Sequence, residues 1–233
     1  MMPISRFTSI VLLATCLVHA EDMNAQRPES SNTQSLDFPA GGVLHMTNAI
    51  GEITVEGWDQ PGMEITVIKS SKNVVDDKQK NRDKATYTKE LDAMKVTAER
   101  KGDEVLVLTS YPKHEVFARP FFGRAYVDVE YRIKVPRAAR VNIDQYSGET
   151  HIENISGEIR VNAVRGEITV REPDGQYSIQ ARSKFGAVTS DFTGTEKSRK
   201  LFGETFAASA QSTTPQKLFL TIGYGDILIL KIH

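Results

Sequence analysis

The chain has 233 residues, with 29 Lys and Arg against 30 Asp and Glu, and one cysteine, Cys16. The net charge of −1 leaves no basic stripe of the kind that indicates nucleic-acid binding. A single cysteine excludes a disulfide framework within the chain. A chain of this length can bury a hydrophobic core without such cross-links.

Residues 1–20 are predicted to be a secretory signal peptide. Arg6 gives a positive start, an apolar run follows, and Val18-His19-Ala20 fits a small-residue cleavage site. The run is too short to span a membrane. Cys16 leaves a lipoprotein open as an alternative, but the apolar run continues past it, which favours ordinary cleavage. We therefore expect an exported protein, periplasmic or extracellular, without a membrane span.

Residues 21–35 are polar and rich in Ser, Asn and Gln, and are predicted to be a disordered leader. One folded domain is expected over residues 36–233. Its first recognisable unit is Gly51-Glu52-Ile53-Thr54-Val55, followed by a turn at 58–62 and a strand over 63–69.

The next segments interrupt this pattern. Residues 71–93 are charged and carry a sparse apolar stripe, which predicts a helical or irregular insert that covers a flank or an end of the fold. Two strands about Lys101-Gly102-Asp103 are expected to form a hairpin, over 94–100 and 104–111. Clean alternation over 125–135 predicts another strand, which Pro136 ends.

The stretch from Tyr146 to Phe192 carries an internal repeat. Glycines recur at positions 148, 157, 166 and 175, nine residues apart, and each of the first three is followed by Glu and then by alternating apolar residues. Alternation indicates strands with one buried face. In the best copies the shared apolar face consists of Ile53 and Val55, Ile159 and Val161, and Ile168 and Val170.

Nine residues are too few for a strand and a crossover helix. An antiparallel meander and a solenoid with two arms in each coil of about eighteen residues both remain open. The corners hold one glycine per strand instead of the Asn-Gly or Asp-Gly pairs that hairpins prefer, so the solenoid is favoured. The predicted fold is therefore an all-β, single-domain β-solenoid, similar to a parallel β-helix with short coils. After Phe192, an irregular patch over 193–206 precedes final strands at 217–222 and 225–232.

Glycine followed by Asp or Glu and then by Ile or Val, after a signal peptide, resembles the bacterial putative-adhesin family. The matching residues are Gly51–Val55, the run from Gly148 to Val170, the strand Val127–Pro136 and Gly225-Asp226-Ile227. These are secreted domains of unknown function, so the resemblance implies a single-sheet β-solenoid and names no activity. A fold by itself does not supply a function.

The glutamates that follow the glycines are one candidate for chemistry. A coil of about eighteen residues would stack Glu149 on Glu167, roughly 4.8 Å apart, where like charges repel unless a cation intervenes. A metal site or an acid/base pair is one interpretation. The other, which we favour, is a solvated ladder neutralised by Arg160, Arg165 and Arg171, since a true carboxylate pair needs a desolvated cleft.

No other constellation predicts catalysis. His45, His114, His151 and His233 are scattered without metal-ligand spacing, and no nucleophile elbow, P-loop or dinucleotide fingerprint is present. We expect no cofactor, no metal site and no enzyme activity.

The best candidate contact region is an aromatic and basic segment. It consists of Phe117, Arg119, Phe121, Phe122 and Arg124, and Phe202 and Phe206 are candidates to join it. Aromatics and Arg dominate binding hot spots, although these rings would also suit a plug at an open solenoid end. The function expected from the sequence is a cell-envelope binding or scaffold domain whose partner is an unknown glycan or protein. A polysaccharide-cleaving β-helix enzyme is the alternative.

Overall fold

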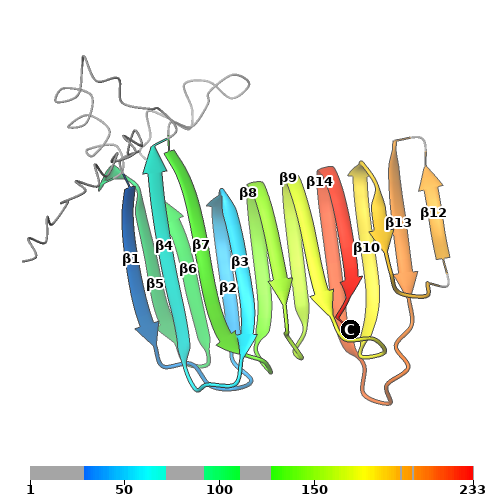
Figure 1. The fold of residues 1–233 in the computed structure, drawn as a ribbon, viewed down its shortest axis with the longest axis horizontal. Helices are drawn as coiled ribbons and strands as arrows, with labels where there is room; N and C mark the ends of the chain where they lie inside the picture. Colours follow the sequence, from blue (N-terminus) through cyan, green and yellow to red (C-terminus); the bar gives the residue numbers. More distant parts are fainter. Residues whose placement is uncertain (1–28, 72–91, 111–126, 195, 201, 233) are drawn as a thin grey trace, which may run out of the picture.

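The computed structural model describes residues 29–71, 92–110, 127–194, 196–200 and 202–232. Every element assigned within them is a strand, and the fourteen strands belong to one hydrogen-bonded sheet (Figure 1). The strands are β1 (Glu29–Leu36), β2 (Val43–Ile50), β3 (Glu52–Trp58), β4 (Met63–Ser71), β5 (Lys95–Lys101), β6 (Glu104–Ser110), β7 (Val127–Pro136), β8 (Arg140–Glu153), β9 (Ile159–Glu172), β10 (Tyr177–Phe185), β11 (Val188–Ser190), β12 (Glu196–Lys200), β13 (Gly203–Ala208) and β14 (Gln216–Lys231).

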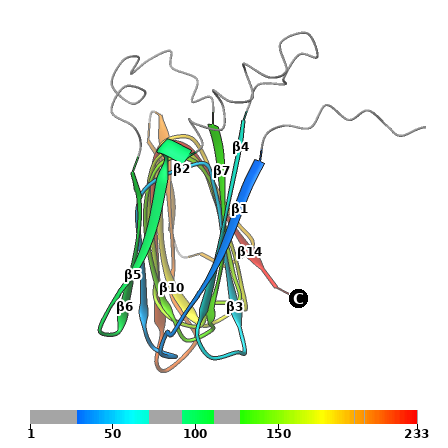
Figure 2. The ribbon, with the colours of Figure 1, turned by 90° about the vertical axis from the view of Figure 1, so that its left-hand side faces the viewer.

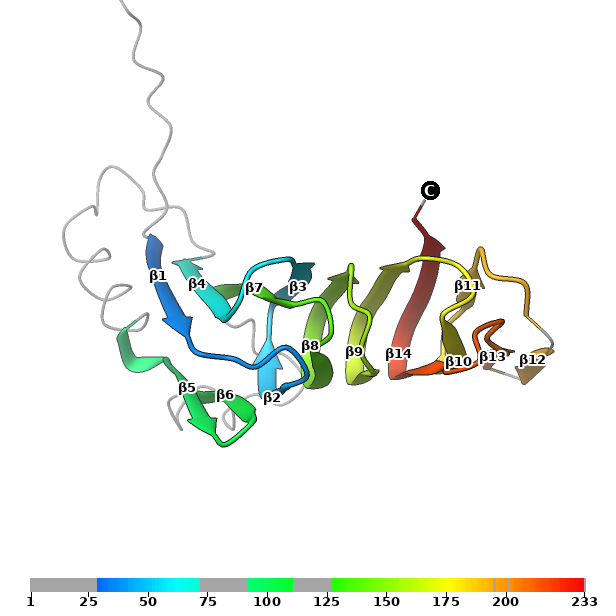
Figure 3. The ribbon, with the colours of Figure 1, turned by 90° about the horizontal axis from the view of Figure 1, so that it is seen from below.

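The longest strands bend in the middle, so that the sheet faces itself. Seen along the row of strands, the arms form two layers joined by turns (Figure 2). The view from below shows the same two rows, with the chain crossing from one to the other (Figure 3). In β8 the first arm pairs with β2, and the second arm pairs with β3. One bent strand therefore contributes to both layers.

The central strands, from β3 through β8, β9 and β14 to β10, pair in parallel and in register. Between β8 and β9, Gly148 pairs with Gly166 and Glu149 pairs with Glu167, so the offset between coils is 166−148 = 18 residues. Between β9 and β14, Gly166 pairs with Gly225. β8 and β9 thus pair in parallel at an offset equal to two repeats of nine residues.

Five glycines form a column at the bend, which we call the glycine ladder. They are Gly51, Gly148, Gly166, Gly225 and Gly186, with φ angles of 114°, 132°, 128°, 132° and 150°. Residues with a side chain rarely adopt these angles. A Cβ on Gly166 would lie 1.7 Å from the carbonyl oxygen of Gly148, and one on Gly148 would lie 1.9 Å from that of Gly51. Glycine is therefore required both by backbone conformation and by the approach of the next coil.

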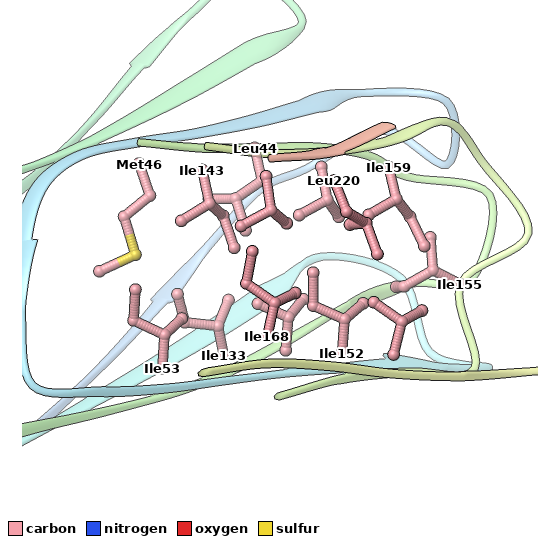
Figure 4. Close-up of a cluster of buried hydrophobic side chains, with 14 of the residues drawn as sticks. Leu44, Met46, Ile53, Ile133, Ile143, Ile152, Ile155, Ile159, Ile168 and Leu220 are labelled. Carbon is pink, nitrogen blue, oxygen red and sulfur yellow. The ribbon is translucent and has the colours of Figure 1, made fainter. Parts of the chain in front are cut away.

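The space between the layers is filled by aliphatic side chains (Figure 4). The residues predicted to share the apolar face are all buried, namely Ile53, Val55, Ile159, Val161, Ile168 and Val170. Burial of one such side chain stabilises the fold by about 1.5–3 kcal/mol. The core thus consists of inward positions of the repeat, supplied by both layers.

The order of the coils does not follow the chain. The path runs β8, β9, β14, β10, β13, β12, so the last strand occupies the slot between β9 and β10. It pairs in parallel with both neighbours. In chain order, β10, β12 and β13 at the far end of the sheet thus come before β14, which lies nearer its middle.

The prediction of a disordered leader through Ser35 is wrong for residues 29–35. They form β1, an edge strand antiparallel to β4, with Leu36 opposite Met63. All of its residues but Leu36 are exposed, so backbone hydrogen bonds hold it in place and no apolar alternation marks it. The predicted signal peptide lies outside the described residues.

The predicted hairpin about Gly102 is confirmed, since β5 and β6 pair antiparallel. The patch expected to be irregular over 193–206 instead contains β12 and β13, a second antiparallel hairpin at the end of the sheet. Of the insert expected near 71–93, Ser71 belongs to β4, and residues 72–91 lie outside the described part.

Two truncations should distinguish the contribution of β14, inside the sheet, to stability from that of the edge strand β1. Ending the chain at Pro215 removes β14 and leaves β9 and β10 without the strand that both pair with, so we expect no cooperative unfolding transition. Starting the chain at Leu36 removes only the exposed β1 and should retain a cooperative transition at a slightly lower denaturant midpoint. Urea unfolding followed by circular dichroism measures both. A cooperative transition in the Pro215 variant would contradict the assigned position of β14.

Candidate binding surface at the glycine corner

The five residues predicted to form the contact region are Phe117, Arg119, Phe121, Phe122 and Arg124. All five lie outside the described residues, so their role stays a prediction. The two further candidates are separated: Phe206 is buried in the core, whereas Phe202 is 71% exposed. Only Phe202 is therefore available on the described surface.

A row of exposed apolar and aromatic side chains lies beside the glycine ladder. We call it the corner ridge, and it consists of Tyr146, Val164, Arg165, Tyr224, Phe185 and Phe202. Its apolar members are among the most exposed large hydrophobic residues described, from 36% for Phe185 to 71% for Phe202. Tyr224 and Phe185 directly precede the ladder glycines Gly225 and Gly186. The bend thus carries these side chains outward.

The stacking of the coils brings the rings together. Register pairs Phe185 of β10 with Tyr224 of β14, and their ring centroids lie 4.8 Å apart with planes 7° apart. The ring of Phe202 lies 6.1 Å from that of Phe185 at an angle of 37°. Three residues that are up to 39 positions apart (224−185 = 39) therefore form one cluster.

Three cations lie on or next to the ridge. Arg165 is in register with Tyr224, and the Lys184 ammonium lies 5.6 Å from the ring centroid of Phe185. Arg182 is exposed two residues before Lys184. Within the described part of the chain, none of the three has an ion-pair partner, whereas Arg132 and Arg137 each pair with a carboxylate. The ridge is thus both apolar and positively charged.

A column of carboxylates lies on the other side of the glycine ladder. Register aligns Glu130 with Glu52, and Glu149 with Glu167 and Asp226. The predicted stacking of Glu149 on Glu167 is confirmed. We call this column the acidic ladder.

The arginines expected to neutralise the acidic ladder do not do so. Arg160 pairs with Glu158 at 3.4 Å, Arg171 lies 3.9 Å from Glu153, and no described carboxylate pairs with Arg165. The reason is that Arg160 lies two residues after Glu158 and Arg171 is in register with Glu153 of β8, so each lies beside an acid outside the ladder.

Other groups contact the acidic ladder instead. His151 lies 3.4 Å from Glu149, the Thr169 hydroxyl donates to Glu167, and the Ala187 amide donates to Asp226. Among the described residues, no group of three or more His, Cys, Asp or Glu side chains is arranged to hold a metal ion.

One of the buried ionisable groups is a glutamate that the sequence analysis did not single out. Glu172 is fully buried, and its Oε1 accepts a hydrogen bond of 2.8 Å from the Ile155 amide. Its Oε2 is buried and has no partner within the described residues. Burial raises the pKa of Glu172 to about 8, so that the carboxyl is largely protonated at neutral pH.

The buried Tyr177 lies near this carboxyl. Its hydroxyl donates to the carbonyl oxygens of Ile155 and Gly157. Burial, together with the nearby Glu172, raises the pKa of Tyr177. Both groups form hydrogen bonds with the backbone of the turn that contains Ile155, and both are buried. They therefore support the fold and do not form a reactive site.

Alternation alone would have predicted that the side chain of Glu172 is buried. Ile168 and Val170 point inward, and Glu172 has the same parity at the end of the strand. The ridge also carried a signal, because an aromatic residue directly before a repeat glycine recurs at Phe185 and Tyr224. Phe202 was a candidate from the sequence, but its approach to Phe185 could not be predicted, because it depends on the hairpin that ends the sheet.

The fold is similar to that of a solved protein that shares little sequence with the chain. The crystal structure of a putative cell adhesion protein from Clostridium sporogenes has 12% sequence identity and a TM-score of 0.51, and the match covers 89% of this chain and 100% of that one. Putative adhesins from Parabacteroides distasonis and Bacteroides fragilis match at 9% and 10% identity, with TM-scores of 0.31 and 0.32. These matches cover 71% and 87% of this chain, and 62% and 97% of theirs.

No protein-family model and no curated protein matches the sequence. The likeness to the Clostridium sporogenes protein shows the fold alone. Within the described ranges, the structure has no helix of the length and apolarity needed to cross a membrane.

Proposed function

We propose that this protein is an exported, non-enzymatic binding or scaffold domain of the cell envelope, whose sheet is a β-solenoid of short coils. The observation that carries the proposal is the corner ridge, in which Tyr224 and Phe185 on neighbouring strands and Phe202 in the β12–β13 turn expose aromatic surface. Exposed aromatic clusters mark interaction sites, because a soluble protein otherwise buries such rings. The structural likeness to a protein described as a putative cell adhesion protein is consistent with this role.

The rigid backbone beneath the ridge supports a binding role. The ridge side chains other than Phe202 extend from strands whose positions are set by in-register pairing on both sides, as for β14 between β9 and β10. A binding surface held in this way loses little conformational entropy on association. Rigidity of the sheet thus favours recognition of a repetitive or extended ligand.

The acidic ladder gives little support to the alternative of a polysaccharide-cleaving enzyme. Glu149 is exposed at the corner and Glu167 is half-buried. A general acid for glycoside cleavage works from a desolvated position that holds its proton near neutral pH. The two carboxylates instead lie at a solvated bend and interact with His151 and Thr169.

Retention of the purified protein on envelope polysaccharides, peptidoglycan and whole cells tests the proposal, with soluble products assayed in parallel. We expect retention without released sugars. Phe185→Ala combined with Phe202→Ala should lower retention at least about tenfold, the loss that about 1.4 kcal/mol of binding free energy represents. The matched control is Leu108→Ala, which removes an apolar side chain that is 37% exposed away from the ridge.

Release of sugars that Glu149→Gln or Glu167→Gln abolishes would identify an enzyme and overturn the proposal. Retention that survives both ridge substitutions would show that the ridge is not the binding surface.

A further inference from the structure

We propose that the corner ridge binds an acidic polysaccharide, with aromatic rings contacting the sugar rings and Arg165 and Lys184 pairing with their carboxylates. This inference rests on the proposed binding function and specifies its ligand class. It follows from the electrostatics of the ridge, its shape and the charge of the surface next to it.

The rings of the ridge present an electropositive edge. One face of Phe185 stacks on Tyr224, with planes 7° apart, and Phe202 lies beside the same ring. The stacking covers the facing sides of Phe185 and Tyr224, so edges make up a larger share of the surface that these two rings expose. Aromatic edges carry partial positive charge and faces carry partial negative charge. The exposed apolar surface therefore favours an anionic ligand over a cationic one.

The unpaired cations also favour an anionic ligand. Lys184 lies over the ring of Phe185, and Arg165 is the in-register neighbour of Tyr224 on the next strand. Arg182, also exposed, extends the positive charge along β10. Within the described residues none of these cations has a carboxylate partner, so their charge is available to a ligand. A ligand with carboxylates spaced between apolar ring faces would satisfy both kinds of group.

The shape of the ridge fits a linear polymer. Its members other than Phe202 come from β8, β9, β14 and β10, which are consecutive in the sheet, and Phe202 lies in the turn between β12 and β13. Neighbouring strands lie about 4.8 Å apart, so the ridge extends about 14 Å across these four strands. It is only one or two side chains wide. A protein partner of ordinary affinity would cover about 20 to 30 residues on each side, far more than the ridge offers.

The acidic ladder favours a polymer over a membrane as the ligand of the ridge. Glu167 and Asp226 lie two residues after Arg165 and Tyr224, on the other side of the glycine ladder. An anionic lipid surface is broad, so insertion of the ridge would bring these carboxylates against lipid headgroups of the same sign. A single polysaccharide chain can follow the ridge on its cationic side without covering the acidic ladder.

The test is calorimetric titration of the full-length protein with polygalacturonate, alginate and hyaluronate, each beside its methyl-esterified, neutral form. We expect at least one acidic polymer to bind at least tenfold more tightly than its neutral form, and its affinity to fall with added salt. Arg165→Gln with Lys184→Gln should weaken that binding at least tenfold, as should Phe202→Ala. The controls are Arg140→Gln, which removes a cation from β8 away from the ridge, and Leu108→Ala; both should bind as the unaltered protein does.

Several outcomes would overturn the inference. Equal affinity for acidic and neutral forms, or binding that the ridge substitutions leave unchanged, would remove its electrostatic basis. Retention on whole cells or peptidoglycan without binding to any acidic polymer would overturn it while leaving the proposed binding function intact. Binding to anionic lipid vesicles and to no polymer would replace the polysaccharide with a membrane. Absence of retention on every surface would overturn both proposals.

Discussion

Gly166→Ala is expected to destabilise the fold by more than about 4 kcal/mol, a loss that single substitutions seldom reach. The new Cβ would lie 1.7 Å from the carbonyl oxygen of Gly148 and would also be held at a φ of 128°. The atom that blocks it belongs to the backbone of the neighbouring coil, so no side chain can rotate away. Relief requires β8 and β9 to separate at the bend, which breaks hydrogen bonds in both layers.

Two other glycines provide matched controls. Gly102 has a φ of 63°, yet a Cβ there would meet nothing within 4 Å, so Gly102→Ala isolates the backbone strain of about 1–2 kcal/mol. Gly41 has neither constraint, and Gly41→Ala should be close to neutral. Urea unfolding of the three variants measures the differences. If Gly166→Ala cost no more than Gly102→Ala, close stacking at the glycine ladder would be disproved.

Glu172→Gln is expected to remove a decline in stability that the unaltered protein shows as pH rises. The buried carboxyl has a folded-state pKa of about 8, against its ordinary value of 4.5. Between these values the folded state holds a proton that the unfolded state has lost, so the free energy of unfolding falls as pH rises. The full effect is about 5 kcal/mol as an upper limit, complete above pH 8 and absent below pH 4.5.

The glutamine variant keeps an oxygen for the Ile155 amide but cannot ionise. Its free energy of unfolding, measured in urea from pH 5 to pH 9, should lose the downward slope and exceed that of the unaltered protein at pH 9. Glu149→Gln is the control, since that carboxyl is exposed at the corner, and its curve should keep the slope. Parallel curves for Glu172→Gln and the unaltered protein would show that Glu172 does not hold its proton in the folded state.

The repeat allowed the paired arms of β8 and β9 to be predicted, because alternation and glycine spacing are properties of local sequence. Ile159 and Ile168 are buried as their parity requires. The order of the coils could not be predicted in the same way. The glycine unit around Gly225 matches that around Gly166 closely, and such a unit can stack on any other, so nothing local assigns β14 to the slot before β10.

Elements without apolar alternation were missed for a related reason. β1 is held by backbone pairing with β4 and by no buried side chain before Leu36, so its composition is that of a disordered segment. The corner ridge was missed because it combines residues from separate coils. Only the insertion of β14 beside β10 brings Tyr224 onto Phe185, although both precede a repeat glycine.

The most direct test of the account is retention of the protein on whole cells and envelope polysaccharides, compared with the Phe185→Ala, Phe202→Ala double variant. The account predicts that the unaltered protein is retained without release of sugars, and that the double variant folds normally but is retained at least tenfold less. Equal retention of a folded double variant would contradict the assignment of the corner ridge as the binding surface.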